Sequence, residues 1–270
     1  METVLITGCS SGIGAATARA FLADDWRVYA TARDPADIDD LAAAGCETAP
    51  LDVTGDAVEA VVERVMDEAG RIDCLVNNAG YGQFGAVEDV PPERLEAQFA
   101  VNVIGPHRLA RAVLPHMRAA GTGRIINVSS TLAGVATPGS GPYAASKAAL
   151  ESMSAALRSE VADHGIDVVV VVPGPVETRF RRRAMQEVDG LPRTGAYDSV
   201  YGLLEDWEAL GGGFAASSPE TVAAAILNSA TCSSPAPRST VGPLARLASY
   251  GRLVPAGLRD RAFGLLLRLA

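Results

Sequence analysis

Short apolar runs alternate with amphipathic segments of helical period along most of this chain, and this alternation constrains the fold more than any other feature. The segment "DVVVVVP" at 167–173 is an almost unbroken series of valines, which is typical of a strand covered on both faces, as in a parallel sheet. The pattern predicts a single α/β domain, with a doubly wound, Rossmann-like, mostly parallel sheet of about seven strands and helices on both faces. The first six expected strands cover 4–7, 27–31, 46–51, 74–78, 124–130 and 167–173.

The regular pattern runs without a linker to about residue 178 and then breaks. Residues 179–217 carry arginines, aromatic residues and the glycine triplet 211–213. A long irregular insertion of this kind is typical of an active-site lid, so we interpret the segment as a substrate lid.

A further helix over 219–229 and a last strand over 238–242 are expected after the lid, which places the whole of 1–242 in one domain. The remaining residues, 243–270, alternate leucine with arginine at helical spacing. Three roles stay open for this tail: packing on the sheet, pairing with a second subunit, or contact with a membrane surface.

The composition argues against a nucleic-acid partner and against a metal site. The net charge is −9, and the only basic run is "RFRRR" at 179–183, for which a solvated helix face is favoured over an anion-binding role. The four cysteines are scattered and the three histidines form no ligand cluster, so we expect no metal and a small-molecule partner. No secretory signal and no apolar stretch of about 20 residues is present, which predicts a cytoplasmic protein without a transmembrane segment.

A glycine-rich segment, "TGCSSGIG" at 7–14, stands between the first expected strand and the first helix. Gly8, Gly12 and Gly14 allow a sharp turn and a close approach of the backbone to a pyrophosphate, which then lies at the positive end of the helix. The position of these glycines at the first strand–helix junction predicts a dinucleotide site.

Six motifs together resemble one family. They are "TGCSSGIG", "NNAG" at 77–80, Asn102, "NVSS" at 127–130, "YAASK" at 143–147 and "PGPVET" at 173–178. In this order they resemble the single-domain branch of the short-chain dehydrogenases/reductases, and "TGCSSGIG" with "VYATARD" is similar to the hydroxysteroid and retinol dehydrogenase group. The resemblance implies an enzyme that transfers a hydride between a nicotinamide cofactor and an alcohol or carbonyl.

The residue after the second strand indicates which cofactor is preferred. Family members that use NAD carry an aspartate where this chain has Ala32, and the next residue is Arg33, whose guanidinium can bind a 2′-phosphate with paired hydrogen bonds. Ser11 lies where its hydroxyl could add another hydrogen bond. The sequence therefore favours NADP(H). NAD(H) stays open as the alternative, with Asp34 binding the ribose and Arg33 a solvated turn residue.

The resemblance also implies the remaining cofactor contacts. Asp52 and Val53 are expected to flank the adenine, although Asp52 has a helix-capping role as a close competitor. Val176 and Thr178 are expected against the nicotinamide carboxamide, while Pro173 and Gly174 have a turn as their alternative role. The other expected cofactor residues are Ser10, Ile13, Asn78, Ala79 and Gly80.

The catalytic chemistry is expected in "YAASK". A free tyrosine has a pKa of about 10 and is a poor base at neutral pH. Lys147, the only lysine of the chain, follows Tyr143 by four residues and so shares its helix face. A charge about 4 Å away is worth about 4 kcal/mol at a dielectric near 20, which predicts a phenol pKa near neutrality. By resemblance, Ser130 stabilises the substrate oxygen, and Asn102 holds a water in a proton relay, with a buried satisfied amide as its alternative role.

The sequence thus predicts an NADP(H)-dependent oxidoreductase that forms homodimers or homotetramers. The alternatives are an NAD-dependent alcohol dehydrogenase of the same family and a non-catalytic NADP(H)-sensing protein. An apolar pocket for a steroid-, retinoid- or lipid-like substrate is expected from aromatic and sulfur-containing residues in and near the lid. These residues are Phe84, Phe180, Met185, Tyr197, Tyr201, Trp207 and Phe214, with a place in the core as their alternative.

Overall fold

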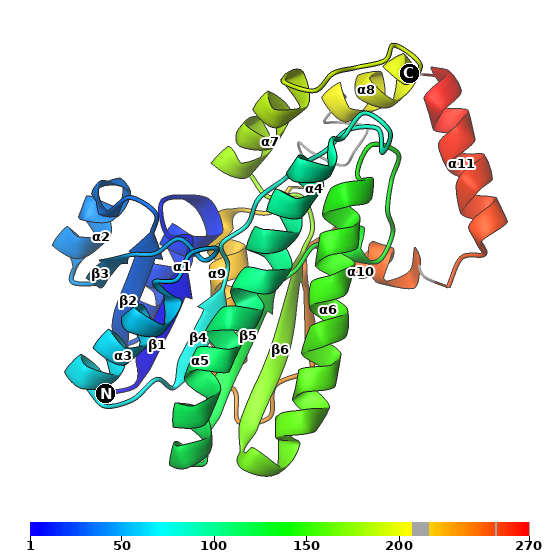
Figure 1. Cartoon of the computed structure of the whole chain (residues 1–270). Helices are drawn as coiled ribbons and strands as arrows, with labels where there is room; N and C mark the ends of the chain where they lie inside the picture. Colours follow the sequence, from blue (N-terminus) through cyan, green and yellow to red (C-terminus); the bar gives the residue numbers. More distant parts are fainter. Residues whose placement is uncertain (207–215, 252, 270) are drawn as a thin grey trace.

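The computed structural model describes residues 1–206, 216–251 and 253–269 (Figure 1). Within these residues one sheet contains seven parallel strands in the order β3-β2-β1-β4-β5-β6-β7. The expected doubly wound α/β fold is confirmed. The strands are β1 (Thr3–Thr7), β2 (Arg27–Ala32), β3 (Glu47–Pro50), β4 (Cys74–Asn77), β5 (Gly123–Val128), β6 (Ile166–Pro173) and β7 (Arg238–Val241).

Helices cover both faces of this sheet. One apolar core lies between the sheet and α1 (Gly12–Ala23) with α9 (Pro219–Thr231), where Phe21 and Ile226 are fully buried. The other lies between the sheet and α3 (Val58–Ala69), α5 (Gly105–Ala120) and α6 (Gly141–Val161). Because both faces are covered, the strands carry apolar side chains on both sides. The short helix α2 (Asp39–Ala44) lies at the β3 edge in Figure 1.

The order of the strands reverses between β1 and β4. Leu5 of β1 pairs with Tyr29 of β2 on one side and with Leu75 of β4 on the other. In a doubly wound sheet the crevice at the carboxyl ends of two such strands is where a nucleotide binds. The glycine loop after β1 and the "NNAG" segment after β4 both open at this point.

The helical stretch between β4 and β5 is interrupted. Helix α4 (Pro92–Phe99) passes into a π-helical segment, Ala100–Ile104, before α5 begins. A π-helical turn accommodates one extra residue, and such turns are frequent at functional sites. The interruption contains Asn102, which is fully buried.

The lid differs from the irregular insertion that the sequence predicts. Its described part forms two helices, α7 (Arg179–Asp189) and α8 (Asp198–Glu205). Tyr201 and Leu204 of α8 pack on Val188, Leu191 and Val90 in a small separate core. The glycine triplet 211–213, Trp207 and Phe214 lie outside the described residues.

The tail forms two helices, α10 (Pro243–Gly251) and α11 (Ala256–Leu269). Helix α10 lies against β7, while α11 lies beside α8 of the lid and away from the sheet (Figure 1). Leu258, Leu265 and Leu266 of α11 are exposed. No helix among the described residues combines the length and apolarity that crossing a membrane requires.

Candidate active site

The glycine loop is packed so tightly that none of its three glycines leaves room for a side chain. A Cβ atom on Gly14 would lie 2.2 Å from the carbonyl oxygen of Gly8 and 2.5 Å from Nδ2 of Asn78. A Cβ on Gly12, whose φ is +59°, would lie 2.8 Å from Cγ2 of Thr178. The loop therefore brings its backbone close to "NNAG" and to the start of the lid.

The first turn of α1 has no side-chain cap. Ser11 occupies the cap position in extended geometry, but its hydroxyl accepts no hydrogen bond from the first turn. Uncapped backbone N–H groups at the positive end of a helix attract a phosphate. The residues present at this junction fit the pyrophosphate of a dinucleotide, which was the expected role of this loop.

The "NNAG" segment is fixed to the glycine loop by a set of hydrogen bonds. The Asn78 amide donates to the carbonyl oxygens of Thr7 and Gly8 at 2.9 and 3.1 Å. The backbone N–H groups of Asn78 and Ala79 donate to the Thr7 hydroxyl. Gly80 follows and is exposed, so the backbone is open to a ligand at the end of β4.

Tyr143 lies in the first turn of α6, and its hydroxyl is hydrogen-bonded to Ser130 at the end of β5. Burial raises the pKa of Tyr143 to about 12, and the Ser130 hydrogen bond opposes this shift. The predicted lowering of this pKa to near neutrality is therefore wrong for this structure. The charge of Lys147, on which that prediction rested, does not offset the desolvation of the buried phenol.

Lys147 lies one helical turn after Tyr143 and is also buried. Its Nζ donates to the carbonyl oxygen of Val128 at 2.9 Å and lies 5.9 Å from the centre of the Tyr143 ring. Burial lowers the pKa of Lys147 to about 8, and the Glu151 carboxylate opposes this shift. The two side chains share a helix face as expected, but the ammonium is hydrogen-bonded to the backbone of β5.

Asn102, in the π-helical segment, is hydrogen-bonded through both ends of its amide group. Its Oδ1 accepts from the backbone N–H of Tyr81 at 2.9 Å, and its Nδ2 donates to the carbonyl oxygen of Tyr81 at 2.9 Å and to Oγ of Ser146 at 3.0 Å. This is the satisfied buried amide that the sequence left open as the alternative role. The π-helical turn positions Asn102 for these contacts.

Two phenylalanine rings cover Tyr143. Phe84 stacks on it with ring centres 5.0 Å apart, and Phe180 of the lid lies tilted at 5.6 Å. The Phe180 ring also fills the space beside Gly82, where a Cβ atom would lie only 2.6 Å from the ring. The lid is thus packed directly against the tyrosine, a contact that sequence reasoning missed because no local pattern pairs a lid residue with α6.

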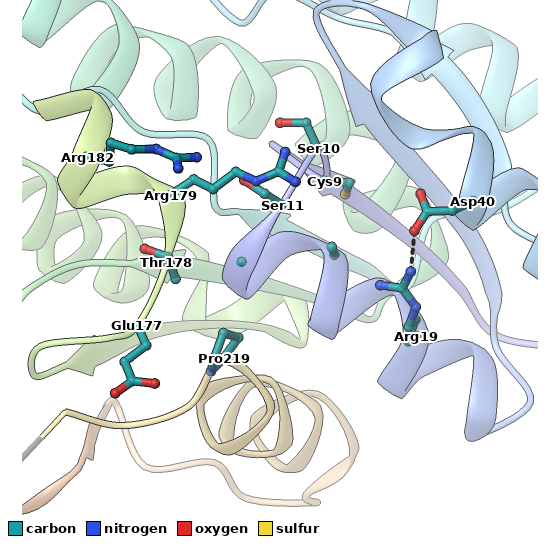
Figure 2. Close-up of a pocket in the computed structure, with 12 residues that line it drawn as sticks. Cys9, Ser10, Ser11, Arg19, Asp40, Glu177, Thr178, Arg179, Arg182 and Pro219 are labelled. Atoms are coloured by element: carbon teal, nitrogen blue, oxygen red, sulfur yellow. Dashed lines mark hydrogen bonds and ion pairs between the residues drawn. The ribbon is translucent and has the colours of Figure 1, made fainter. Parts of the chain in front are cut away.

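A cavity of about 640 Å³ lies beside the glycine loop (Figure 2). Ser10, Ser11 and Gly12 line one side, and Thr178, Arg179 and Arg182 line the other. Tyr143 and Ser130 are not among its lining residues. The cavity is therefore the loop side of the site, and the tyrosine side lies beneath Phe180.

Comparisons with known proteins show which family this chain belongs to. The family model described as short chain dehydrogenase matches residues 2–189. The chain belongs to the short-chain dehydrogenase family. A crystal structure of a short-chain dehydrogenase from Streptomyces avermitilis is 34% identical with a TM-score of 0.83, covering 96% of this chain and 94% of that one. A metagenomic short-chain oxidoreductase in complex with NADP is 30% identical with a TM-score of 0.68, covering 89% and 96%.

Relatives known from sequence are named as oxidoreductases too. The chain is 39% identical to the uncharacterized oxidoreductase YbbO of Escherichia coli over 71% of this chain and 72% of that protein. It is 36% identical to a 3-ketodihydrosphingosine reductase of Bacteroides thetaiotaomicron over 91% and 90%. An NADPH-dependent 3-dehydrocapnine reductase of Ornithobacterium rhinotracheale is 34% identical over 68% and 69%. The expected family and enzyme class are confirmed.

The end of β2 in this short-chain dehydrogenase holds the residues expected to select the cofactor. Arg33 is exposed and helps to lower the pKa of Asp52, although the Thr54 hydrogen bonds contribute more. Asp34, the alternative ribose ligand, accepts the backbone N–H of Ala36 at 3.0 Å and caps a short helical turn. The cap occupies one oxygen of Asp34, which leaves Arg33 as the side chain open to a phosphate.

Asp52 closes a turn after β3 in this short-chain dehydrogenase. Its Oδ1 accepts from the backbone N–H and the hydroxyl of Thr54 at 2.9 and 2.7 Å. It closes this turn rather than capping α3, which starts later with Ala57 at the cap position. Val53 is buried and packs against Gly105 of α5, where a Cβ atom would lie 2.7 Å from the valine.

The "PGPVET" segment lies between β6 and the lid of the short-chain dehydrogenase. Pro173 ends β6, and the backbone N–H of Gly174 donates to Val241 of β7. Val176 forms an isolated parallel bridge with Ser217. The Thr178 hydroxyl accepts the backbone N–H of Phe180 at 3.3 Å and so caps α7, while its methyl group faces Gly12. Ile13 is half-buried in the first turn of α1.

Proposed function

We propose that this short-chain dehydrogenase is an NADP(H)-dependent oxidoreductase that interconverts a ketone or aldehyde and an alcohol. The observation that carries this proposal is the hydrogen bond between the Tyr143 hydroxyl and Ser130, with Lys147 one helical turn after Tyr143. The same site contains the tightly packed glycine loop, whose backbone suits a phosphate. The cofactor supplies or accepts the hydride when it is bound. The chain supplies the proton and the dipoles around the reacting oxygen.

Tyr143 is the proton donor in the direction of reduction. Its raised pKa keeps the phenol protonated at neutral pH, which is the form that can give a proton to a carbonyl oxygen. Ser130 donates a second hydrogen bond to the same oxygen and stabilises the charge that develops on it. Lys147 favours the phenolate that remains, because its positive charge lies on the same side of α6.

The preference for NADP(H) rests on Arg33. Arg33 is exposed and follows β2, the strand that pairs with β1 before the glycine loop. The last residue of β2 is the buried Ala32 and not an acidic residue. The relative named as NADPH-dependent and the neighbour in complex with NADP support the same preference. NAD(H) is the competing cofactor.

An apolar substrate is proposed from the lid. Phe84, Met185 and Tyr197 are half-buried against the small core that joins α7, α8 and the 86–90 segment, and Phe84 stacks on Tyr143. Tyr201 belongs to the core itself, with its hydroxyl donating to Asp89 at 2.8 Å. The name of one relative, a 3-ketodihydrosphingosine reductase, supports a ketone as the reacting group.

The test is a panel of steroid, retinoid and long-chain keto-lipid carbonyls with NADPH and NADH in parallel. Substrate-dependent loss of NADPH absorbance, faster than with NADH, is the expected result. A chain that binds NADPH but oxidises it with no carbonyl would instead be a cofactor-sensing protein.

We also propose that the chain assembles into a homo-oligomer through α5 and α6, which lie side by side on one face of the sheet (Figure 1). The outward face of α6 carries exposed small side chains at Ala145, Ser152 and Ala156, at helical spacing. Small side chains allow two helices to approach closely across a symmetry axis.

A further inference from the structure

The four arginines at the start of α7 have separate environments. Arg181 donates to the carbonyl oxygens of Leu204 and Glu205 at 3.2 and 3.3 Å and so ties α7 to the end of α8. Arg183 is exposed and is not part of the cavity wall. Arg179 and Arg182, three residues apart on one side of α7, line the cavity beside the glycine loop.

Figure 2 shows the Arg179 and Arg182 side chains extending from α7 toward Ser10 and Ser11, with the Arg179 guanidinium next to the loop. No hydrogen bond or ion pair joins either arginine to another side chain or carbonyl in the part of the chain that the structure describes. The opposite wall is the uncapped start of α1. Three sources of positive potential thus face one cavity in a chain whose net charge is −9.

The acidic residues of the cavity do not neutralise these two arginines. Asp40 is ion-paired with Arg19 at the far end of the cavity. Glu177 is exposed and points away from the glycine loop in Figure 2. The space between Arg179, Arg182 and the start of α1 therefore suits a dianionic group.

We propose that Arg179 and Arg182 bind the pyrophosphate of the nicotinamide cofactor and so hold α7 against it. This proposal rests on the proposed function in so far as the ligand is a dinucleotide. An arginine can bind phosphate oxygens through paired charge-assisted hydrogen bonds, and the start of α1 binds the same group from the other side. The sequence favoured a solvated face for this arginine run, because only the fold brings α7 to the glycine loop.

The position of Phe180 gives this contact a consequence for catalysis. Phe180 stands next to Arg179 in the chain and lies on the Tyr143 ring. A phosphate that fixes Arg179 and Arg182 therefore also fixes the phenylalanine that covers the catalytic tyrosine. The same ligand therefore holds α7 in place at the glycine loop and at the tyrosine together.

The experiment measures the binding of NADPH and NADH to the full chain by isothermal titration calorimetry, without substrate. Arg179→Gln and Arg182→Gln are each expected to raise the Kd of both cofactors by about tenfold, as the loss of charge-assisted hydrogen bonds implies. Arg183→Gln is the matched control on the same helix and is expected to change neither Kd. Far-UV circular dichroism and thermal unfolding check that the three variants fold alike.

Three outcomes would overturn the proposal. A higher Kd for NADPH alone would place the arginines on the 2′-phosphate. Unchanged Kd values for both cofactors would show that the arginines face solvent. An equal rise in Kd in Arg183→Gln would indicate a general charge effect. Turnover does not enter this readout. If the wild type binds both cofactors tightly but reduces no carbonyl, the proposed enzyme activity is wrong. The proposed contacts of Arg179 and Arg182 would still be decided by the Kd values of their variants.

Discussion

At the scale of a single residue, we propose Tyr143 as the proton donor, because its buried hydroxyl is hydrogen-bonded to Ser130. We expect Tyr143→Phe to lower kcat by about a thousandfold, the size of a lost general acid. The Kd of NADPH should stay within about twofold, since the ring and its stacking on Phe84 are kept. Tyr29→Phe is the matched control, because the Tyr29 hydroxyl bonds Glu68 away from the site. Near-normal turnover in Tyr143→Phe would remove this residue from the mechanism.

Lys147 gives a prediction for the pH dependence of stability. Burial lowers its pKa from 10.5 to about 8, so at pH 7 the folded protein bears the cost of a buried charge, which corresponds to about 3 kcal/mol. Lys147→Met removes this charge at similar volume and should raise the free energy of unfolding at pH 7. Between pH 8 and 10.5 the unfolded chain holds the proton that the folded chain has released, so the wild type gains stability as pH rises.

The stability difference between Lys147→Met and the wild type should therefore shrink from pH 7 to pH 10. Urea unfolding of both proteins at pH 7, 8.5 and 10 measures it, and groups other than Lys147 cancel in the difference. A constant difference across this range would show that the lysine is charged throughout in the folded protein.

Arg33 separates the two cofactor alternatives. Arg33→Asp is expected to shift the NADPH to NADH ratio of kcat/KM toward NADH by roughly tenfold or more, because a carboxylate repels the 2′-phosphate and accepts the ribose hydroxyls. Asp34→Ala should leave the ratio almost unchanged, since Asp34 caps the turn at Ala36. The reverse pattern, with Asp34→Ala changing the ratio and Arg33→Asp not, would assign the ribose to Asp34.

The shared helix face of the proposed catalytic pair was predictable from spacing, but the ionisation of the two side chains was not. Tyr143 and Lys147 share a face of α6 because they are four residues apart, and that is a local property. Their pKa values depend on how deeply β5, Phe84 and Phe180 bury them, and these come from distant parts of the chain. The same reason explains why Arg179 and Arg182 read as a solvated run in the sequence.

At the scale of an element, the junction between β1 and α1 depends on the absence of a side chain at Gly14. We expect Gly14→Ala to lower the free energy of unfolding by about 3 kcal/mol and to weaken NADPH binding, because the new Cβ would meet the Gly8 carbonyl oxygen at 2.2 Å and push the loop apart. Gly264→Ala in α11 has no heavy atom within 4 Å of the new Cβ and should be neutral or slightly stabilising. Equal unfolding temperatures for Gly14→Ala and wild type would contradict this packing.

The lid shows where sequence reasoning about elements stops. Thr178 is a good N-cap residue and "RFRRR" contains no helix breaker, so the local sequence is compatible with α7. The high charge of the run hid this helical signal. Helix α8 packs on Val90 and Leu191, and the hydroxyl of its Tyr201 donates a hydrogen bond to Asp89. Val90 and Asp89 are distant from α8 in the chain, and Leu191 is separated from it by a segment without helical pattern, so no local signal predicts these contacts. In contrast, the strands were predictable, because continuous apolar runs between amphipathic helices admit few other arrangements.

At the scale of the whole molecule, only part of the tail packs on the sheet, which is one of the three roles that the sequence left open. Helix α10 lies against β7 at the edge of the sheet, but α11 lies on α8 and leaves a row of leucines, including Leu258 and Leu265, exposed. The leucine and arginine spacing predicted a helix here. It could not predict the partner, because the contact with the lid depends on where α8 ends.

Assembly gives the last prediction. If α6 forms the subunit interface, Ala156→Arg places a charged, bulky side chain where two helices meet and should convert the oligomer to monomers at micromolar concentration. Ala43→Arg, on exposed α2 at the opposite edge of the sheet, is the matched control and should keep the wild-type mass. Size-exclusion chromatography with light scattering measures the mass of all three proteins. A monomeric wild type, or an Ala156→Arg variant of unchanged mass, would show that α6 faces solvent, and the exposed leucines of α11 would then be the next surface to substitute.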